Sequence, residues 1–139
     1  MKKQRRGWAY KNGFTLVELL IVIAVIGILA AIGYVAYGGM QDRAREAVVR
    51  SDLVKAAETL NTDRIRGGGT EFPDSVEDAD RGKGLAASAD TSYQYTVDNS
   101  VVPPTFCLTG TNGMIAMYIT EEGTVSKGVC GGHSEPVEV

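Results

Sequence analysis

The sequence predicts an α+β fold, in which a long N-terminal α-helix (a transmembrane half followed by an amphipathic half) packs on a small antiparallel β-sheet head. Two patterns carry this prediction. The stretch 19–37 has 19 residues without a charge, and apolar residues then recur at helical spacing up to residue 65. After residue 91, apolar and polar residues alternate in short runs between turn residues, which is typical of strands.

A basic leader precedes the apolar run. The first 13 residues hold five cations and no acid, namely Lys2, Lys3, Arg5, Arg6 and Lys11. Positive charge beside an apolar span predicts that this end stays in the cytoplasm while the acidic C-terminal part crosses the membrane. Together with residues 14–17, the run is long enough to span the ~30 Å hydrocarbon layer as a helix. We therefore expect a leader at 1–13 and a membrane helix at 14–38.

Residues 39–66 predict an amphipathic continuation of the same helix. No proline interrupts 14–66, and apolar residues fall on one face of the second half: Val49, Leu53, Ala56, Ala57 and Leu60. Glycines 67–69 end the helix, because glycine readily adopts the left-handed backbone of a helix terminus.

Residues 67–139 predict a small head. Residues 70–91 are acidic and rich in turn residues, and we expect a loop with a short helical turn near 75–79. Strands are expected at 92–97, 105–109, 114–120 and 124–130, with a hairpin turn at 121–123 and a loose tail at 133–139 carrying a solvent-exposed His133. Such a sheet needs an apolar cover, which the stripe on 49–60 can provide.

Glu18 is a single carboxylate near the start of the apolar run. An acid in a membrane-grade segment is costly, so it calls for a partner. The alternative is an interfacial acid near the cytoplasmic headgroups, where the cost is small.

The two cysteines, Cys107 and Cys130, both lie in the part expected to be exported. An even count in a small exported domain favours a disulfide. Closing that loop could contribute roughly 3 kcal/mol. The alternative is two unpaired buried thiols.

The acid cluster at 74–80 is a weak candidate for calcium. Asp74, Asp78 and Asp80, with Glu77 among them, could offer oxygen ligands, but no glutamate stands at the twelfth position that an EF-hand loop requires. We therefore expect a solvated loop and no metal. No Ser/His/Asp or Cys/His set can be assembled, so the sequence predicts neither an enzyme nor a cofactor nor a small-molecule substrate.

The stretch Gly13-Phe14-Thr15-Leu16-Val17-Glu18, between a basic leader and a long apolar helix, resembles the type IV prepilin family, which includes the pseudopilins. The resemblance implies the pilin fold, with 14–38 as the filament core. It also implies that prepilin peptidase cuts between Gly13 and Phe14, that Phe14 is N-methylated, and that Glu18 acts in assembly. Family heads often end in a disulfide-closed loop, which Cys107 and Cys130 resemble.

The same resemblance bears on helix flexibility. Gly27 matches a glycine near which some family filaments loosen the helix. Many members have a proline about eight residues later, where this chain has Val35. Gly33 is expected to supply the local softness instead.

Cutting after Gly13 would create a charged amine at Phe14. A neighbouring subunit that places its amine against Glu18 satisfies both charges, whereas a wrong register leaves both bare, so the pair suits register more than raw stability. Losing the leader's cations would also let the helix leave the bilayer, because charges resist passage through lipid.

By this resemblance the chain is a structural subunit of a type IV pilus, a helical homo-oligomer serving adhesion, twitching motility or DNA uptake. Its expected partners are prepilin peptidase, an inner-membrane assembly platform and minor pilins. Before assembly it would be a single-pass inner-membrane protein with a cytoplasmic N-terminus, and afterwards part of a surface pilus or a periplasmic pseudopilus. The alternatives are a pseudopilin of type II secretion and a membrane-tethered or secreted binding module.

Overall fold

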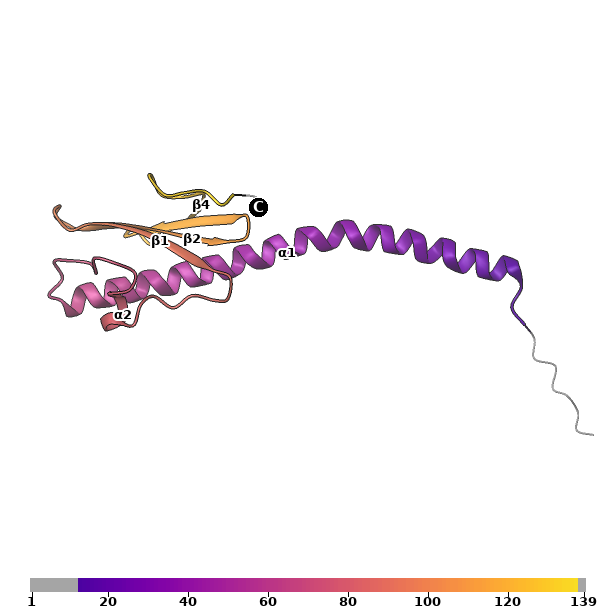
Figure 1. Ribbon diagram of the computed structural model, residues 1–139, viewed down its shortest axis with the longest axis horizontal. Coiled ribbons are helices and arrows are strands. Elements are labelled where there is room, and N and C mark those ends of the chain that lie inside the picture. Colours follow the sequence, from indigo (N-terminus) through magenta and orange to yellow (C-terminus); the bar gives the residue numbers. More distant parts are fainter. Residues whose placement is uncertain (1–12, 138–139) are drawn as a thin grey trace, which may run out of the picture. The chain divides into compact units, whose positions relative to one another are not determined.

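The computed structural model describes residues 13–137 and has the predicted α+β fold (Figure 1). Its elements, in chain order, are α1 (Leu16–Arg66), α2 (Ala79–Gly82), β1 (Ser92–Asp98), β2 (Thr105–Asn112), β3 (Ile115–Thr120) and β4 (Val125–Lys127). The leader cations at 2–11 lie outside the described residues.

The chain divides into two compact units between Gly38 and Gly39. We call the described part of the first unit, residues 13–38, the N-terminal segment, and that of the second, residues 39–137, the head. Helix α1 contributes residues to both units.

Four antiparallel strands form the sheet of the head, in the order β1-β2-β3-β4. Asn112 lies opposite Ile115, so the connection from β2 to β3 is a tight turn, and Gly113 within it has a φ of 58°. The predicted turn at 121–123 joins β3 to β4, with Gly123 at a φ of 78°. Sequential pairing of this kind needs only short connections.

All four predicted strands are present, but three of the predicted boundaries are wrong by one residue and two are wrong by three residues. Strand β2 continues three residues past Thr109 to Asn112, because its whole length pairs with β3 and β1. Strand β4 covers only Val125–Lys127, since Gly128 leaves the extended conformation with a φ of 105°.

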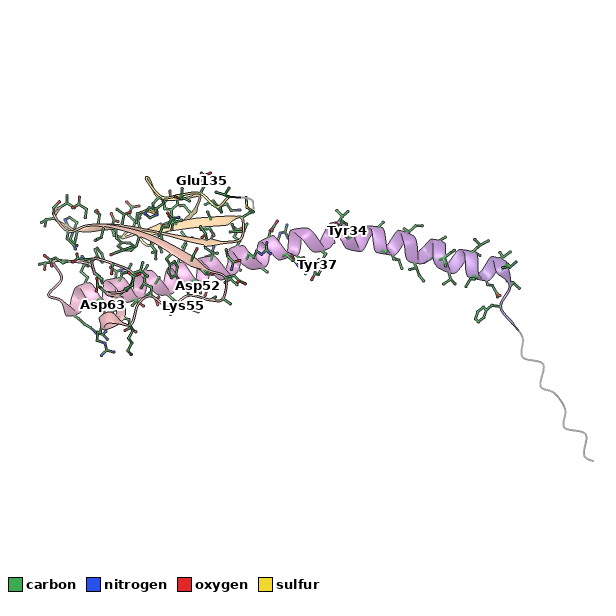
Figure 2. The ribbon with its side chains drawn as sticks, viewed as in Figure 1. Tyr34, Tyr37, Asp52, Lys55, Asp63 and Glu135 are labelled. Atoms are coloured by element: carbon green, nitrogen blue, oxygen red, sulfur yellow. A yellow bond between two sulfur atoms is a disulfide. The ribbon has the colours of Figure 1, made fainter. Side chains whose placement is uncertain are left out.

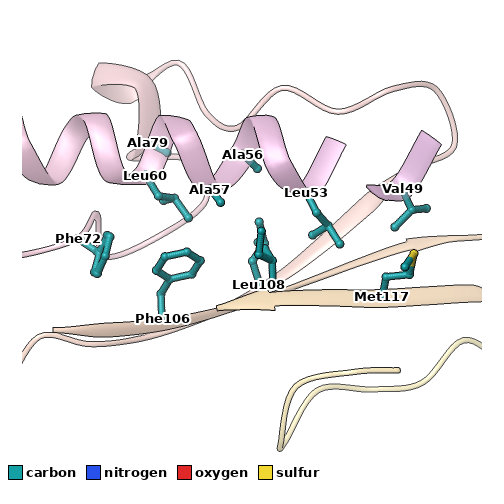
Figure 3. Close-up of a cluster of buried hydrophobic side chains, with 11 residues drawn as sticks. Val49, Leu53, Ala56, Ala57, Leu60, Phe72, Ala79, Phe106, Leu108 and Met117 are labelled. Carbon is teal, nitrogen blue, oxygen red and sulfur yellow. The ribbon is translucent and has the colours of Figure 1, made fainter. Parts of the chain in front are cut away.

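The predicted apolar stripe of α1 forms the core of the head (Figure 3). All five of its residues are buried. They pack against one face of the sheet, against a loop residue and against the first residue of α2, and the partners are Phe106, Leu108, Met117, Ile119, Phe72 and Ala79. Burial of this many apolar side chains is the main favourable contribution to the stability of the head.

Gly110 of β2 allows α1 to lie close to the sheet. A Cβ atom at this position would lie 3.2 Å from Cγ1 of Val49 and 3.2 Å from Cδ2 of Leu53, which is tighter than ordinary van der Waals contact. In the sequence this glycine stands among threonines and an asparagine and reads as part of a turn.

Helix α1 ends at the glycine run, as predicted. Gly68 and Gly69 have φ values of 98° and 84°, and the N–H of Gly69 donates to the carbonyl of Arg64 at 2.8 Å. A backbone with positive φ turns these N–H groups toward the last carbonyl groups of the helix. Residues with a Cβ atom rarely adopt this conformation.

A turn lies within residues 75–79, where one was predicted, and the short element α2 (Ala79–Gly82) follows it. The hydroxyl of Ser75 donates to the carboxylate of Asp78 at 2.7 Å and accepts its N–H at 3.2 Å, which closes a turn before any helix begins. Within α2, Asp80 and Arg81 have left-handed backbones with φ of 49° and 61°. A turn is therefore present near 75–79, as predicted, but the residues after it do not form a regular helix.

Candidate functional site

The N-terminal segment presents an apolar surface that the described chain leaves uncovered. Its large apolar side chains, from Phe14 to Tyr37, are between 49% and 89% exposed, and Figure 2 shows Tyr34 and Tyr37 projecting from α1. The segment is long and apolar enough to cross a membrane. A contiguous apolar surface of this size marks a membrane or protein contact.

Glu18 caps the helix that carries it. Its carboxylate accepts the backbone N–H and the hydroxyl of Thr15, both at 2.9 Å, and the hydroxyl of Thr15 accepts the N–H of Glu18 at 3.2 Å. Thr15 directly precedes Leu16, the first residue of α1. This reciprocal arrangement is a capping box.

The capping role of Glu18 was missed in the sequence, although the signal is present. Thr15-Leu16-Val17-Glu18 has the S/T-x-x-E spacing of a capping box in front of an apolar run. Glu18 therefore already has a partner for its carboxylate within its own chain. Any assembly role must compete with that contact or share the carboxylate with it.

Within the described residues, no contact accounts for the roles predicted for the other residues of the N-terminal segment. Gly13 and Phe14 precede α1, and Phe14 is 89% exposed. Gly27 and Gly33 lie inside α1, and a Cβ atom at Gly13 or at either helical glycine would meet nothing within 4 Å. The roles predicted for these four positions in processing, methylation and helix softening stay predictions.

The predicted disulfide is present. Cys107 of β2 is bonded to Cys130, with a Cα–Cα distance of 6.0 Å. The bond ties the segment that follows β4 to the second strand of the sheet.

We call residues 131–137 the strap. Two of its residues, His133 and Ser134, contact side chains on the outer face of the sheet, the face opposite α1. Ser134 and Gln94 of β1 exchange two hydrogen bonds, each 2.9 Å long. The ring of His133 contacts the hydroxyls of Thr109 and Thr96 at 2.7 and 2.6 Å. Thr109 is fully buried. The prediction of a loose tail with an exposed His133 is therefore wrong for residues 133 and 134, because two threonine hydroxyls hold His133 and the side-chain amide of Gln94 holds Ser134.

A buried carboxylate on α1 fixes the loop that leads to β1. Asp52 is only 4% exposed, and it accepts the backbone N–H of Ser88 at 3.0 Å and the hydroxyl of Ser88 at 2.8 Å. Burial alone would raise the pKa of Asp52, but the hydrogen bonds from Ser88 and Thr91 and the charge of Lys55 outweigh it and lower that pKa.

The same carboxylate affects a neighbouring tyrosine. Burial, with a further contribution from the charge of Asp52, raises the pKa of Tyr93 to about 12. The hydroxyl of Tyr93 donates to the carbonyl of Ala86 at 3.0 Å. Asp52 and Tyr93 thus hold the same loop from the helix and from the sheet.

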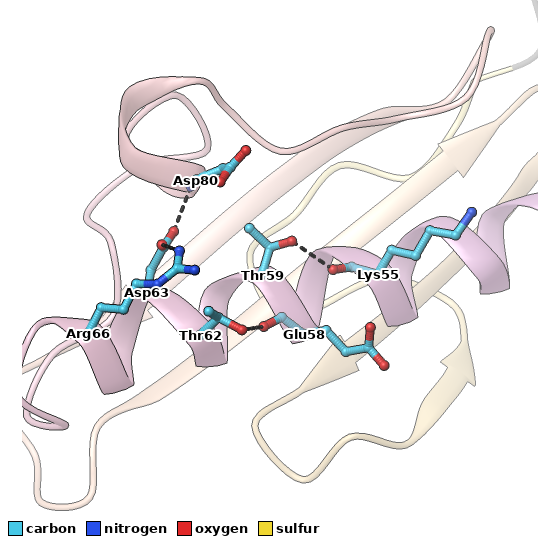
Figure 4. A network of polar contacts seen from close by, with 7 residues as sticks. All are labelled: Lys55, Glu58, Thr59, Thr62, Asp63, Arg66 and Asp80. Carbon is cyan, nitrogen blue, oxygen red and sulfur yellow. Dashed lines mark hydrogen bonds and ion pairs between the residues drawn. The ribbon is translucent and has the colours of Figure 1, made fainter.

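The three calcium candidates do not form a site. Asp74 accepts a hydrogen bond from Asn99 at 3.3 Å and Asp78 one from Ser75 at 2.7 Å. Asp80 donates its backbone N–H to the carboxylate of Asp63 at 2.6 Å, and Figure 4 shows this bond beside the Asp63–Arg66 ion pair. Within residues 13–137, no group of three or more His, Cys, Asp or Glu side chains could hold a metal ion.

Comparison with known proteins bears on the N-terminal segment first. The family model described as the prokaryotic N-terminal methylation motif matches residues 8–34. That range contains the capped helix start, the acid at 18 and most of the exposed apolar surface.

Two curated relatives match most of the chain. Fimbrial protein EcpC of Eikenella corrodens is 38% identical over 125 residues, which cover 87% of this chain and 70% of that protein. The type IV major fimbrial protein FimA of Dichelobacter nodosus is 34% identical over 127 residues, which cover 87% of this chain and 76% of that protein. The chain belongs to the type IV pilin family.

Other pilin relatives are matched over a smaller share of their length. The fimbrial protein of Neisseria meningitidis is 36% identical over 114 residues, which cover 76% of this pilin but 61% of that protein. None of the solved structures matches this pilin significantly. The relatives are named fimbrial proteins, and the matched region includes the head as well as the N-terminal segment.

Proposed function

We propose that this pilin is the building subunit of a type IV pilus, cut by prepilin peptidase after Gly13, methylated at Phe14 and assembled through its N-terminal segment. The observation that carries the proposal is the uncovered apolar surface from Phe14 to Tyr37. Most of this surface lies on α1, a helix that is long and apolar enough to cross a membrane. Lipid would cover this surface before assembly, and equivalent segments of other subunits would cover it afterwards.

In this proposal the organisation of the chain follows its chemistry. Residues 1–13 are the leader, 14–38 the filament-core helix, 39–66 the amphipathic continuation, and 67–139 the sheet-bearing part of the head. The leader cations hold the subunit in the inner membrane with its N-terminus in the cytoplasm. Removing them frees the helix for an assembly platform, with minor pilins as further partners.

Glu18 would select the register of assembly. In the single chain its carboxylate is occupied by Thr15, and a carboxylate has acceptor capacity for further donors. The charged amine created at Phe14 of a neighbouring subunit is such a donor. A register that leaves the amine unpaired in an apolar filament core is disfavoured, because an unpaired buried charge is costly.

Mass spectrometry of the N-terminal peptide from sheared surface fibres tests this proposal. We expect a chain that starts at N-methylated Phe14. The variant Gly13→Glu should stay uncut in the membrane fraction, whereas Asn12→Gln, which leaves both residues of the cut bond intact, should be processed normally.

Two outcomes would contradict the proposal. A mature chain that starts beyond Ala31 would indicate an ordinary signal peptide and a released or tethered binding module. Correct processing without long surface fibres would favour a pseudopilin of type II secretion. The pilus is preferred because the relatives are named fimbrial proteins. Adhesion, twitching motility and DNA uptake are the roles such a fibre would serve.

A further inference from the structure

The hydrogen bonds of the Thr109 hydroxyl determine which ring nitrogen of His133, in the strap, carries the proton. The hydroxyl oxygen of Thr109 accepts the N–H of Cys130 at 2.9 Å. Among the described residues, the only other hydrogen-bond partner of this hydroxyl is Nδ1 of His133 at 2.7 Å. Since Thr109 is fully buried, its hydroxyl proton must point to Nδ1. Nδ1 is therefore the acceptor, and the ring proton lies on Nε2 and is donated to Thr96.

Protonation of this histidine would put two donors face to face. A second ring proton on Nδ1 points at the hydroxyl of Thr109, which has no other acceptor among the described residues. A buried donor without an acceptor is costly. Burial also lowers the pKa of His133, so both effects favour the neutral ring when the strap is closed.

Among the described residues, few charged groups share the outer face of the sheet with His133. On β1 the charged residue is Asp98, whose carboxylate accepts the N–H and hydroxyl of Ser100, which lowers its pKa. Glu121, after β3, accepts the N–H of Phe106 at 3.3 Å, and Glu135 lies on the exposed part of the strap. The remaining titratable side chain on this face is Tyr118 of β3, and Cys107 of β2 is held in the disulfide.

The chain next to His133 is built to open locally. Cys130 is fixed to β2 by the disulfide, and Gly131 and Gly132 separate it from His133. Gly132 has a φ of 86°, and glycines adjust such angles easily. The strap can therefore leave the sheet while the segment up to Cys130 stays in place.

We propose that His133 is an acid-sensitive latch: protonation of its Nδ1 atom releases the strap from the outer face of the sheet, while the disulfide keeps Cys130 attached. Above the ordinary pKa of histidine, about 6.5, the strap is closed. The stabilisation is lost as the pH falls from there through the lowered pKa of the folded state. Opening uncovers the Thr96 and Thr109 hydroxyls and frees the Gln94 side chain, which changes the surface that the head offers at acidic pH.

Hydrogen exchange of the full chain in detergent micelles tests the latch at about pH 7.5 and about pH 5, on the two sides of the ordinary histidine pKa. After correction for intrinsic exchange rates, protection of the Ser134 amide, which donates to Gln94, should fall roughly tenfold at the lower pH, the cost of one unmade buried hydrogen bond. Amides of β3 should keep their protection and serve as the internal reference.

Two variants separate the latch from a general effect of acid. In His133→Asn the side-chain oxygen can accept the Thr109 hydroxyl but cannot titrate, so the strap should stay protected at both pH values. Thr109→Ser keeps the hydroxyl and should keep the pH response. Equal strap protection of the unmodified chain at both pH values would overturn the proposal. An unchanged pH response in His133→Asn would also overturn it, because another group would then be responsible.

Should His133→Asn fold poorly, NMR titration of the His133 ring in the unmodified chain decides the question. The latch requires that Ser134 has lost its protection once the ring is protonated. A ring that becomes protonated while Ser134 keeps its protection would contradict it.

Discussion

Aliphatic side chains of α1 have very different exposure on the two sides of Gly38. In the N-terminal segment, Ile23 and Leu29 are 56% and 64% exposed, whereas in the head Leu53 and Leu60 are fully buried. Both stretches are helical and rich in apolar residues. They differ in where the covering surface comes from, since the head carries its own sheet and the N-terminal segment has no partner within residues 13–137. Changes in the first should affect association, and changes in the second should affect folding.

The largest expected effect comes from Glu18→Gln. Glutamine can keep the capping box with Thr15, but it has no charge to meet the Phe14 amine of a neighbouring subunit. We expect the yield of sheared surface fibres to fall by about tenfold or more, with the thermal unfolding midpoint of the head unchanged. Immunoblots of sheared and membrane fractions measure the first, and circular dichroism of the detergent-solubilised chain measures the second.

The matched control for Glu18→Gln is Thr15→Val, which removes the hydroxyl of the cap and leaves the charge in place. It should assemble better than Glu18→Gln if charge pairing sets the register. Normal fibres from Glu18→Gln would show that capping, rather than charge, is what assembly needs from this residue.

The next largest effect is expected in the core of the head. Leu53→Ala removes a fully buried side chain from between α1 and the sheet and should lower the free energy of unfolding by about 3 kcal/mol. Its neighbour Val54 is 40% exposed, so Val54→Ala should cost less than about 1 kcal/mol. Urea unfolding of both variants checks the difference.

A third variant, Leu20→Ala, extends the unfolding measurement from the head to the N-terminal segment. Leu20 is 61% exposed, so Leu20→Ala should leave the unfolding of the head unchanged. Equal losses in Leu53→Ala and Leu20→Ala would mean that the two regions do not fold as separate units.

Those parts of the fold that depend on local patterns could be predicted from the sequence. The 3.6-residue spacing from Val49 to Leu60 predicted the buried stripe. Alternation, apolar content and the turn residues between the runs predicted the four strands. The capping role of Glu18 also has a local signal, which is its spacing from Thr15. Interpreting Glu18 only as an acid in a membrane segment leaves this signal unused.

What could not be predicted depends on residues far apart in the sequence. Asp52 and Ser88 are 36 residues apart, and Thr109 and His133 are 24 apart. A polar residue on a helix shows no local sign of a distant loop amide that will bind it. Gly110 resembles a turn glycine until the side chains of α1 are placed above it. The processing and assembly residues depend on other molecules, so the fold of one chain leaves them as predictions.

The smallest expected effect concerns Asp52 and depends on pH. In Asp52→Asn one of the two oxygens that accept from Ser88 becomes an NH2 group, which cannot accept, and the other loses its charge. The free energy of unfolding at neutral pH should therefore fall by about 1–2 kcal/mol. The lowered pKa of Asp52 means that its stabilisation is complete above the ordinary carboxyl value of about 3.9. It is lost as the pH falls through the lower pKa of the folded state. Stability curves of both proteins from neutral to acidic pH should therefore converge at the acid end.

The exposed carboxylate of Glu58, on the same helix, provides the control for this pH dependence. Glu58→Gln should leave the stability curve within about 0.5 kcal/mol of the unmodified chain at every pH. If Asp52→Asn keeps a constant offset from the unmodified chain down to the acid end, the hydrogen-bonded charge is not the source of the effect. The offset would then reflect a change in packing around Ser88. Packing, rather than the charge of Asp52, would then hold the loop that contains Ser88.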